Sequence, residues 1–296
     1  MDVVIPMQLN SNFTLLYPVQ VDWEKFTAYR PDIPFSDEVI EFLNILSGGI
    51  LKDRNSRLYP DVITFAFFCR KANLQKLKGE YVHEELRLGR GVLFHIAPSN
   101  VPINFGYSLV AGLLSGNINI VRVSSKQFPQ VDLIIKHLHE ILKSELYDEV
   151  ASRIVLVRYD RTSDANAYFS SIANVRVIWG GDTTIATIRQ SALPARSFDV
   201  CFADRYSIAA INPTAIISAT DVEMKRLAEA FYNDTYLFDQ NACSAPHTIF
   251  WLSADCLEAA KDRFWNTFHD YVLSKYQLQA VMSVDKLTAS IVRQYV

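Results

Sequence analysis

A cysteine in a polar segment is the first residue of this sequence that could do chemistry. Cys243 lies in the stretch FDQNACSAPHTIFW, just before an apolar run that predicts a strand. A structural thiol more often lies inside an apolar strand or helix face, as Cys201 does in DVCFA. A reactive thiol also needs a helix terminus, a cation or a general base nearby. His247 is four residues on, but Pro246 argues against a helical pairing. The residues alone leave two roles open for Cys243: a buried structural cysteine or a nucleophile.

The cysteines as a set do not form a metal-binding or disulfide pattern. They lie at positions 69, 201, 243 and 256, with no C-x-x-C pair and no histidine pair at zinc spacing. We therefore expect neither a structural metal site nor a disulfide framework.

A rigid loop with an amide side chain follows one of the predicted strands. In HIAPSNVPINFG, Pro98 and Pro102 flank Asn100. Prolines restrict the backbone of a loop, so this loop can aim the Asn100 amide at a ligand. A turn-forming Asn is the commoner role for such a residue, and both interpretations stay open.

A second loop combines groups that suit a phosphate. In RVSSKQFP, Ser124, Ser125 and Lys126 end a predicted strand and lead into a predicted helix. Hydroxyl groups, a cation and free N–H groups at a helix start can bind a phosphate. The alternative is an ordinary helix cap with a solvated lysine.

A third loop repeats this arrangement. In WGGDTT, Gly180 and Gly181 allow a close backbone approach, and Asp182 or Thr183 can cap the helix that follows. Two such loops on one sheet predict a dinucleotide site. The usual G-x-G-x-x-G fingerprint is missing, because GRG at 89–91 precedes a strand instead of following one. A dinucleotide must therefore bind by another scheme.

The elements that would position these loops alternate between strands and helices. Short β-rich runs predict strands at 91–97, 118–123, 153–159, 175–180, 198–203, 207–212 and 247–252. Longer amphipathic runs predict helices at about 103–115, 127–145, 163–173, 183–191, 221–236 and 255–276. This alternation predicts an α/β fold with a central parallel sheet, and ligands of such sheets bind beyond the carboxyl ends of the strands.

The first ninety residues differ from the rest. They contain a mixed extended stretch, then predicted helices near 36–47 and 56–77 with SGGILKDRNS between them as a loop. We expect this part to form a helical cover for the sheet.

Composition excludes several broad classes of function. The chain has 29 Lys+Arg against 32 Asp+Glu, a net charge of −3, and no basic run. It is therefore not expected to bind nucleic acid. It has no signal-peptide pattern at residues 1–10 and no apolar run long enough to cross a bilayer. These features predict a cytoplasmic protein without a membrane span.

The loops, in this order, resemble the LuxC-type acyl-CoA reductases, the long-chain fatty-acid reductase component of bacterial luminescence within the aldehyde dehydrogenase superfamily. The matching segments are 89–126, 175–189 and 231–251. The resemblance implies an aldehyde-dehydrogenase-like fold with a Rossmann-like cofactor domain over 1–205. Residues 206–296 would form the first part of an α/β catalytic domain that carries Cys243.

The resemblance also implies a role for each matched residue. Cys243 matches the nucleophile that takes the acyl group as a thioester, and Asn100 matches the residue whose amide stabilises the oxyanion with the backbone N–H of Cys243. The residues implied to bind the cofactor are Ser124, Ser125, Lys126, Gly180, Gly181 and Asp182.

Two departures from the superfamily refine the expected reaction. Hydrolytic aldehyde dehydrogenases carry a Glu that activates water where this chain has Phe202 or Ala203, so the acyl-enzyme should survive long enough to be reduced. NAD-preferring relatives carry a Glu where Lys126 stands. A cation there attracts a 2′-phosphate, which predicts NADPH as the cofactor.

The resulting expectation is the NADPH-dependent reduction of a fatty acyl thioester to the aldehyde. The expected partners are the thioester itself, an acyl-protein synthetase or acyl carrier protein, and further copies of the chain in a homo-oligomer. Two alternatives are a non-reducing cysteine acyltransferase or hydrolase, and a non-catalytic acyl- or protein-binding module. Because 53 residues follow Cys243, we expect either a fragment or a shortened form.

Overall fold

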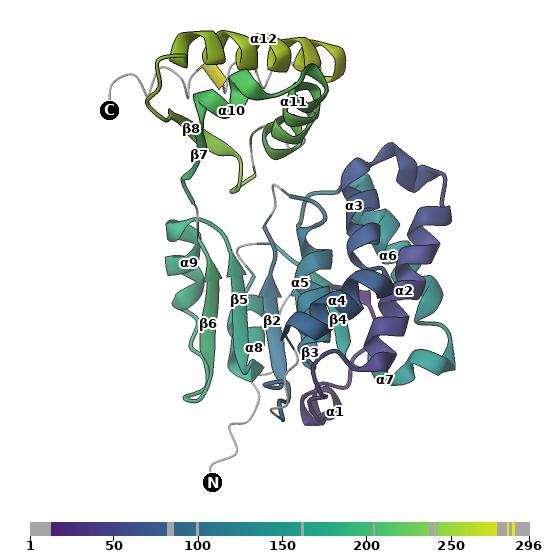
Figure 1. Cartoon of the computed structure of the whole chain (residues 1–296). Coiled ribbons are helices and arrows are strands. Elements are labelled where there is room, and N and C mark those ends of the chain that lie inside the picture. The colour runs from purple at the N-terminus through teal and green to yellow at the C-terminus, as the bar shows by residue number, and fades with distance from the viewer. Residues whose placement is uncertain are drawn as a thin grey trace. The chain divides into compact units, whose positions relative to one another are not determined.

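The computed structural model describes residues 13–81, 86–98, 101–160, 163–203, 205–236, 240, 242–276, 283 and 286–287. The chain divides into two compact units, Met1–Asp204 and Arg205–Val296. A six-stranded sheet is the centre of the first unit, and a two-stranded sheet belongs to the second (Figure 1).

Five parallel strands and one antiparallel edge strand make up the larger sheet. Its order is β1 (Thr14–Tyr17), β4 (Ile154–Arg158), β3 (Ile118–Arg122), β2 (Val92–Ile96), β5 (Val175–Trp179) and β6 (Phe198–Phe202). Only β1 is antiparallel to its neighbour. Buried residues fill β2 throughout and the first four positions of β3, β4 and β5, because helices cover both faces of the sheet. The prediction of a central parallel sheet is confirmed.

The path of the chain through the sheet creates a switch point. From β2 the chain moves to β3 and β4 on one side, and it then returns to β5 and β6 on the other side. In open parallel sheets, the crevice at such a reversal is where ligands bind, beyond the carboxyl ends of the strands. Here the reversal lies between β2 and β5.

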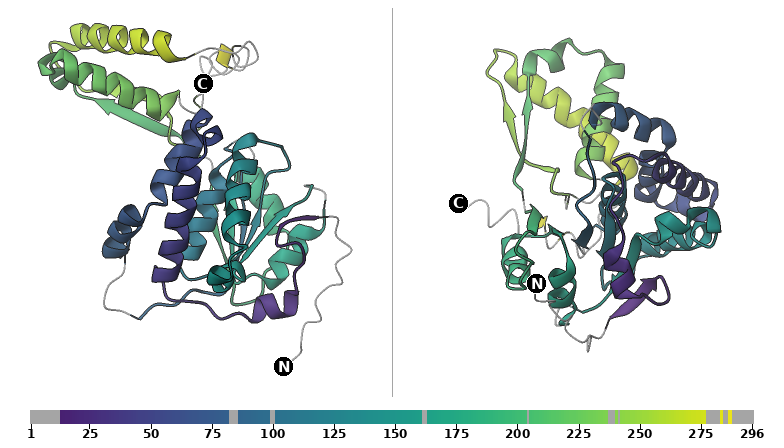
Figure 2. Two further views of the ribbon diagram at one scale, coloured as in Figure 1. Left: turned by 90° about the vertical axis from the view of Figure 1, so that its right-hand side faces the viewer. Right: turned by 90° about the horizontal axis from the view of Figure 1, so that it is seen from below.

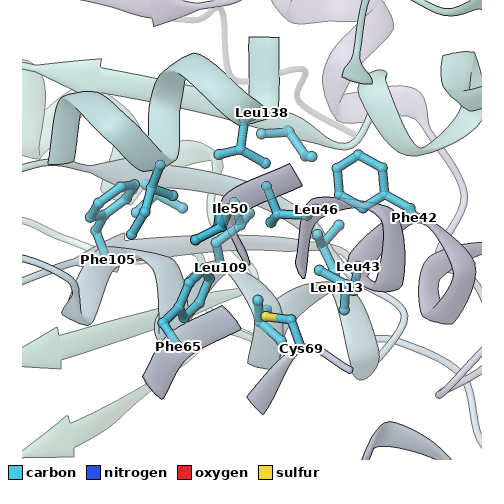
Figure 3. Close-up of a cluster of buried hydrophobic side chains, with 14 of the residues drawn as sticks. Phe42, Leu43, Leu46, Ile50, Phe65, Cys69, Phe105, Leu109, Leu113 and Leu138 are labelled. Atoms are coloured by element: carbon cyan, nitrogen blue, oxygen red, sulfur yellow. The ribbon is translucent and has the colours of Figure 1, made fainter. Parts of the chain in front are cut away.

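Helices from the first third of the chain cover one face of this sheet. They are α2 (Asp37–Lys52), α3 (Pro60–Phe68) and α4 (Lys71–Tyr81). Two later helices, α5 (Asn104–Leu114) and α6 (Pro129–Ile141), lie on the same face. Their buried side chains form one cluster with the sheet, part of which Figure 3 shows around Leu46, Phe65 and Leu109. The expected helical cover is confirmed for α2 to α4.

The opposite face is covered by shorter helices. They are α1 (Trp23–Ala28), α8 (Ala165–Ile172) and α9 (Asp182–Arg189), and Figure 2 shows the unit from two further sides. A helical turn at Asn55–Leu58, another at Glu145–Tyr147 and the short helix α7 (Asp148–Ala151) complete the first unit.

Helix α2 runs through a segment that the sequence marks as a loop. The predicted loop at 47–56 is wrong for its first six residues, because α2 continues to Lys52. Two glycines there disfavour a helix by about 1 kcal/mol each, but Ile50 is fully buried and its burial contributes about 1.5–3 kcal/mol. The Ser47 hydroxyl also donates to the Ala66 carbonyl at 2.6 Å. Tertiary packing therefore outweighs local propensity.

The predicted helix at 56–77 is two helices. Pro60 has no N–H group and is accommodated at the first position of α3. Cys69 ends α3, and α4 begins at Lys71.

The second unit is built on two parallel strands, β7 (Ser207–Ile211) and β8 (Pro246–Trp251). The helices α10 (Pro213–Ser218), α11 (Asp221–Thr235) and α12 (Leu257–Lys275) pack through Ile216, Met224 and Phe264. Thr220 and Glu223 form a capping box that fixes the start of α11. Helix α10 is not among the predicted helices; Asn212 caps it with a hydrogen bond to Thr214 N–H. Across the described residues, no helix has the length and apolar character needed to span a membrane.

Candidate catalytic cysteine and cofactor loops

Cys243 lies in the loop between α11 and β8, and its side chain is exposed. The Ser207 hydroxyl donates to the Cys243 carbonyl at 2.7 Å, and Ala245 N–H donates to the Ala242 carbonyl at 2.9 Å. Because β7 and β8 are parallel, Ser207 lies beside Pro246 at the amino ends of both strands. The loop is thus fixed through its backbone at this edge, while the thiol remains accessible.

The other three cysteines are less accessible. Cys69 is fully buried in the core of the first unit, as Figure 3 shows, and burial raises the pKa of its thiol. Cys201 is half-buried, not fully buried as DVCFA suggested, since β6 is an edge strand, and its Sγ accepts a hydrogen bond from Arg189 at 3.5 Å. Cys256 is half-buried at the start of α12. Among the four thiols, exposure singles out Cys243.

His247 belongs to β8, so a helical pairing with Cys243 does not occur. Its ring lies 5.3 Å from that of Tyr206, centroid to centroid, and the Tyr206 hydroxyl is 2.6 Å from the Thr248 hydroxyl. The pairing of β8 with β7 holds His247 and Thr248 in an extended conformation.

The Ser124–Lys126 loop follows β3 in the first unit. Ser124 is buried, and its hydroxyl oxygen accepts a hydrogen bond from Lys126 N–H at 3.1 Å. Ser125 and Lys126 are exposed. Helix α6 begins at Pro129, not at 127 as predicted, because Pro129 takes the first helical position. The exposed members of this loop therefore precede the helix instead of forming its first turn.

The Gly180–Asp182 loop follows β5. Gly181 is the N-cap of α9, and Asp182 takes the next position without a side-chain capping bond, so the expectation that Asp182 or Thr183 caps this helix is wrong. A side chain at Gly181 would meet nothing within 4 Å. Open space beside this glycine, next to a helix start without a side-chain cap, is what a bound phosphate group requires.

These two loops lie on the same edge of the sheet, on either side of β2. Their position beyond the carboxyl ends of the strands, at the switch point, fits a dinucleotide. Asn100 lies outside the described residues, as does Asp204. Cys243 belongs to the second unit and the cofactor loops to the first. No group of side chains suited to hold a metal ion occurs in the part of the chain that the structure describes.

Two aromatic residues end β5 and β6 and pack against each other. The rings of Trp179 and Phe202 are stacked, with centroids 3.9 Å apart and an angle of 9° between their planes. From the sequence, we expect Phe202 or Ala203 to stand where hydrolytic relatives carry a Glu. Neither side chain can take a proton from water.

A buried chain of hydrogen bonds, which the sequence did not reveal, links the central strands. The Trp179 indole N–H donates to Ser108 Oγ at 3.2 Å, and Ser108 Oγ is 2.8 Å from His95 Nδ1. His95 Nε2 is 3.0 Å from Asn119 Oδ1. The amide nitrogen of the same Asn119 side chain donates to the Asn117 carbonyl. The Asn119 oxygen accepts from a proton on His95 Nε2, and in the neutral ring Nδ1 accepts from the Ser108 hydroxyl.

Burial lowers the pKa of His95 to about 4, against the opposing effect of the Asn119 hydrogen bond. The network ends on Trp179, the residue directly before Gly180. The signal that could have revealed it is a histidine and an asparagine in otherwise apolar strands, since buried polar groups need partners.

Comparison with known proteins gives one family match and several structural matches. The family model "Acyl-CoA reductase (LuxC)" matches residues 70–262. Long-chain acyl-protein thioester reductase 2 of Photobacterium leiognathi is 23% identical over 260 residues, which cover 83% of this chain and 51% of that protein. This chain therefore spans about half the length of that relative.

Two solved structures illustrate the fold. Lactaldehyde dehydrogenase from Escherichia coli has a TM-score of 0.54 at 13% identity, over 84% of this chain and 53% of that one. A NAD-dependent benzaldehyde dehydrogenase from Corynebacterium glutamicum has a TM-score of 0.53 at 12% identity, over 82% and 54%. At these identities the likeness shows the fold alone, which is that of the aldehyde dehydrogenases.

Proposed function

Because the chain belongs to the LuxC family of acyl-CoA reductases, we propose that it reduces a fatty acyl thioester to the aldehyde through an acyl-enzyme at Cys243. The observation that carries this proposal is the exposed thiol of Cys243, a residue inside the family match whose backbone carbonyl is bonded by the Ser207 hydroxyl. The acyl donor is coenzyme A or an acyl-carrying protein, the latter in line with the name of the relative from P. leiognathi.

The first step is acyl transfer. The Cys243 thiolate attacks the thioester carbonyl, the carbon–sulfur bond to the donor breaks, and the donor thiol leaves with the proton that Cys243 gave up. The carbonyl oxygen carries negative charge in between. The Asn100 amide and the Cys243 backbone N–H would stabilise that charge, with a contribution of about 3 kcal/mol from each donor.

Reduction is the second step. When bound, the nicotinamide cofactor supplies the hydride for it. The residues that would hold the cofactor are Ser125, Lys126, Gly180 and Gly181, and Asp182 lies directly beside them. The reduced carbon remains bonded to Cys243 Sγ until that bond breaks, which releases the aldehyde and returns the Cys243 thiolate. Asn100 and the Cys243 N–H would stabilise the oxyanion in this step as well.

The side chains near the end of β6 favour reduction over hydrolysis. Phe202 and Ala203 have no group that can activate water, and the Phe202 ring is stacked on Trp179. An acyl-enzyme without a general base nearby hydrolyses slowly. It would therefore persist until hydride arrives.

The choice of NADPH over NADH rests on Lys126. Its exposed ammonium attracts a ribose phosphate, whereas a carboxylate at that position would repel one. A cytoplasmic location, a homo-oligomer and an acyl-protein synthetase or acyl carrier protein as partner remain predictions from the sequence.

One assay tests the proposed function. The chain is incubated with a long-chain acyl-CoA labelled in the acyl group, with and without NADPH. We expect label to stay on the protein without NADPH and to leave as aldehyde when NADPH is added. Free fatty acid formed without NADPH would indicate the hydrolase alternative, and a protein that takes up no label would indicate the binding module.

A further inference from the structure

Three cationic residues belong to the loops and strand ends at the carboxyl edge of β3 and β4. They are Arg122, Lys126 and Arg158. Within the described residues none of them forms an ion pair, whereas the buried Arg153 and Arg176 are both paired with carboxylates. The chain as a whole has a net charge of −3. In the part of the chain that the structure describes, no ion pair neutralises these three cations.

Arg158 is held in a defined place by a hydrogen bond to the loop after β3. Its Nε donates to the Ser124 carbonyl at 3.1 Å, which ties the guanidinium to the loop that continues as Ser125 and Lys126. Its Nη2 is buried and has no hydrogen-bond partner among the described residues. An unpaired buried N–H group costs about 1–3 kcal/mol, and a charged one costs more. The side chain is thus oriented in advance by its hydrogen bond to Ser124, and its buried Nη2 has donor capacity that no described residue uses.

Arg158 also lines an open cavity of about 440 Å³, together with Phe13, Thr14, Ser125, Tyr159 and Asp160. Asp160 is the one carboxylate in this lining and would oppose an anion. The groups that favour an anion there are the Arg158 guanidinium and the Ser125 hydroxyl in the lining. The Arg122 guanidinium lies 4.8 Å from the centroid of the ring of Tyr159, which also lines the cavity. A planar guanidinium matches the oxygens of a phosphate monoester.

We propose that Arg158, together with Ser125, binds the 2′-phosphate of NADPH and adds to the preference for this cofactor that Lys126 gives. This inference rests on the proposed use of NADPH. It assigns a different task to each cation. Lys126 attracts the phosphate from an exposed, flexible position, and Arg158 supplies fixed hydrogen bonds from a half-buried one.

The test is calorimetric binding of adenosine phosphates to the 296-residue chain, which needs neither substrate nor turnover. The ligands are 2′,5′-ADP, 5′-AMP and 3′,5′-ADP, the last of which carries the ribose phosphate of coenzyme A. The variants are Arg158→Gln and Arg158→Lys. Arg57→Gln is the matched control, because Arg57 is an exposed arginine that belongs to the helical turn Asn55–Leu58 and not to the loops after β3 and β4.

We expect the unmodified chain to bind 2′,5′-ADP at least tenfold more tightly than either other ligand. Arg158→Gln should weaken 2′,5′-ADP binding roughly 10- to 100-fold and leave 5′-AMP binding within about twofold, which also verifies that the variant is folded. Arg158→Lys should recover only part of the loss, since an ammonium lacks the planar fork. Arg57→Gln should change nothing.

The possible failures are distinguishable. Equal affinity of the unmodified chain for 2′,5′-ADP and 5′-AMP, or no binding of either, would overturn the use of NADPH and this inference with it. A preference for 2′,5′-ADP that survives in Arg158→Gln would overturn the role of Arg158 alone. A preference for 3′,5′-ADP that Arg158→Gln abolishes would assign the site to coenzyme A instead.

Discussion

The chemistry proposed for this chain depends on which single side chains can accept a proton. Cys243 has an exposed thiol, and the end of β6 has a phenyl ring and a methyl group where we expect hydrolytic relatives to have a carboxylate. The fate of the acyl group should therefore be changed by one residue. A base at that position would turn a long-lived thioester into a short-lived one.

Replacing Ala203 by Glu should convert part of the activity to hydrolysis. We expect fatty acid release from acyl-CoA without NADPH to rise on the order of 10²-fold, the usual contribution of a general base. The measurement is the rate of labelled fatty acid formation. Ala203→Gln is the control, because it has similar size and polarity but cannot take the proton. Equal rates for the two variants would show that a base at position 203 cannot reach the acyl-enzyme.

Replacing Lys126 by Glu should shift cofactor preference toward NADH. A carboxylate repels the 2′-phosphate and can accept hydrogen bonds from the ribose hydroxyls. We expect the ratio of the NADPH and NADH dissociation constants to change by roughly 10- to 100-fold. Quenching of tryptophan fluorescence by each cofactor measures it, with Arg57→Glu as the control for charge alone. An unchanged ratio would remove Lys126 from the cofactor site.

At the scale of elements, the buried network joins β2, β3, β5 and α5 behind the Gly180–Asp182 loop. Helix α5 can approach β3 only because residue 112 is a glycine, since a side chain there would overlap Asn119 Oδ1. This close contact lets Ser108 reach both His95 and Trp179. The loop that follows Trp179 is thus held by hydrogen bonds from the centre of the sheet.

His95 should make folding stability depend on pH. Its pKa is about 4 in the folded chain and 6.5 when exposed, so the unfolded chain binds the proton more readily between these values. The free energy of unfolding should therefore fall as the pH drops from about 6.5 to about 4, by on the order of 3 kcal/mol from this group.

Urea titrations at several pH values test this, with His95→Gln as the comparison. Gln does not titrate, and the remaining groups are common to both proteins, so the difference between the two pH profiles isolates His95. We expect the profile of the variant to be flatter between pH 4 and 6.5. Parallel profiles would mean that His95 is not buried as a neutral group.

The sequence predicts the strands well because their signal is local. Runs of apolar residues bounded by turn residues locate β2 to β8 within one or two positions at nearly every end. The course of α2 past Gly48 and Gly49 was not predictable in this way. It depends on Ile50 and Ser47 reaching partners on other elements, which no local pattern reveals.

The candidate site was predictable only where its signal is local in the sequence. Glycines and hydroxyls after the strands pointed to the cofactor loops. Which side chains of those loops are exposed to a ligand could not be predicted. Ser124 is buried, and its hydroxyl accepts a hydrogen bond from Lys126 N–H. Arg158 and His95 depend on neighbours far away in the chain, so neither was found from spacing.

At the scale of the whole molecule, the family match at 70–262 includes residues of both compact units. The cofactor loops and Cys243 therefore fall within a single match. The chain spans about half the length of the relative from P. leiognathi, so its activity is a question for experiment on this chain itself. The central claim is that Cys243 carries the acyl group.

The most direct test is tandem mass spectrometry of the chain after incubation with palmitoyl-CoA in the absence of NADPH. We predict a mass increase of one palmitoyl group on Cys243, its disappearance on addition of NADPH, and no adduct on Cys243→Ala. Cys256→Ser, which removes a half-buried thiol from the same unit, should be labelled as the unmodified chain is. An adduct on Cys69, Cys201 or Cys256 in place of Cys243, or no adduct at all, would contradict the account.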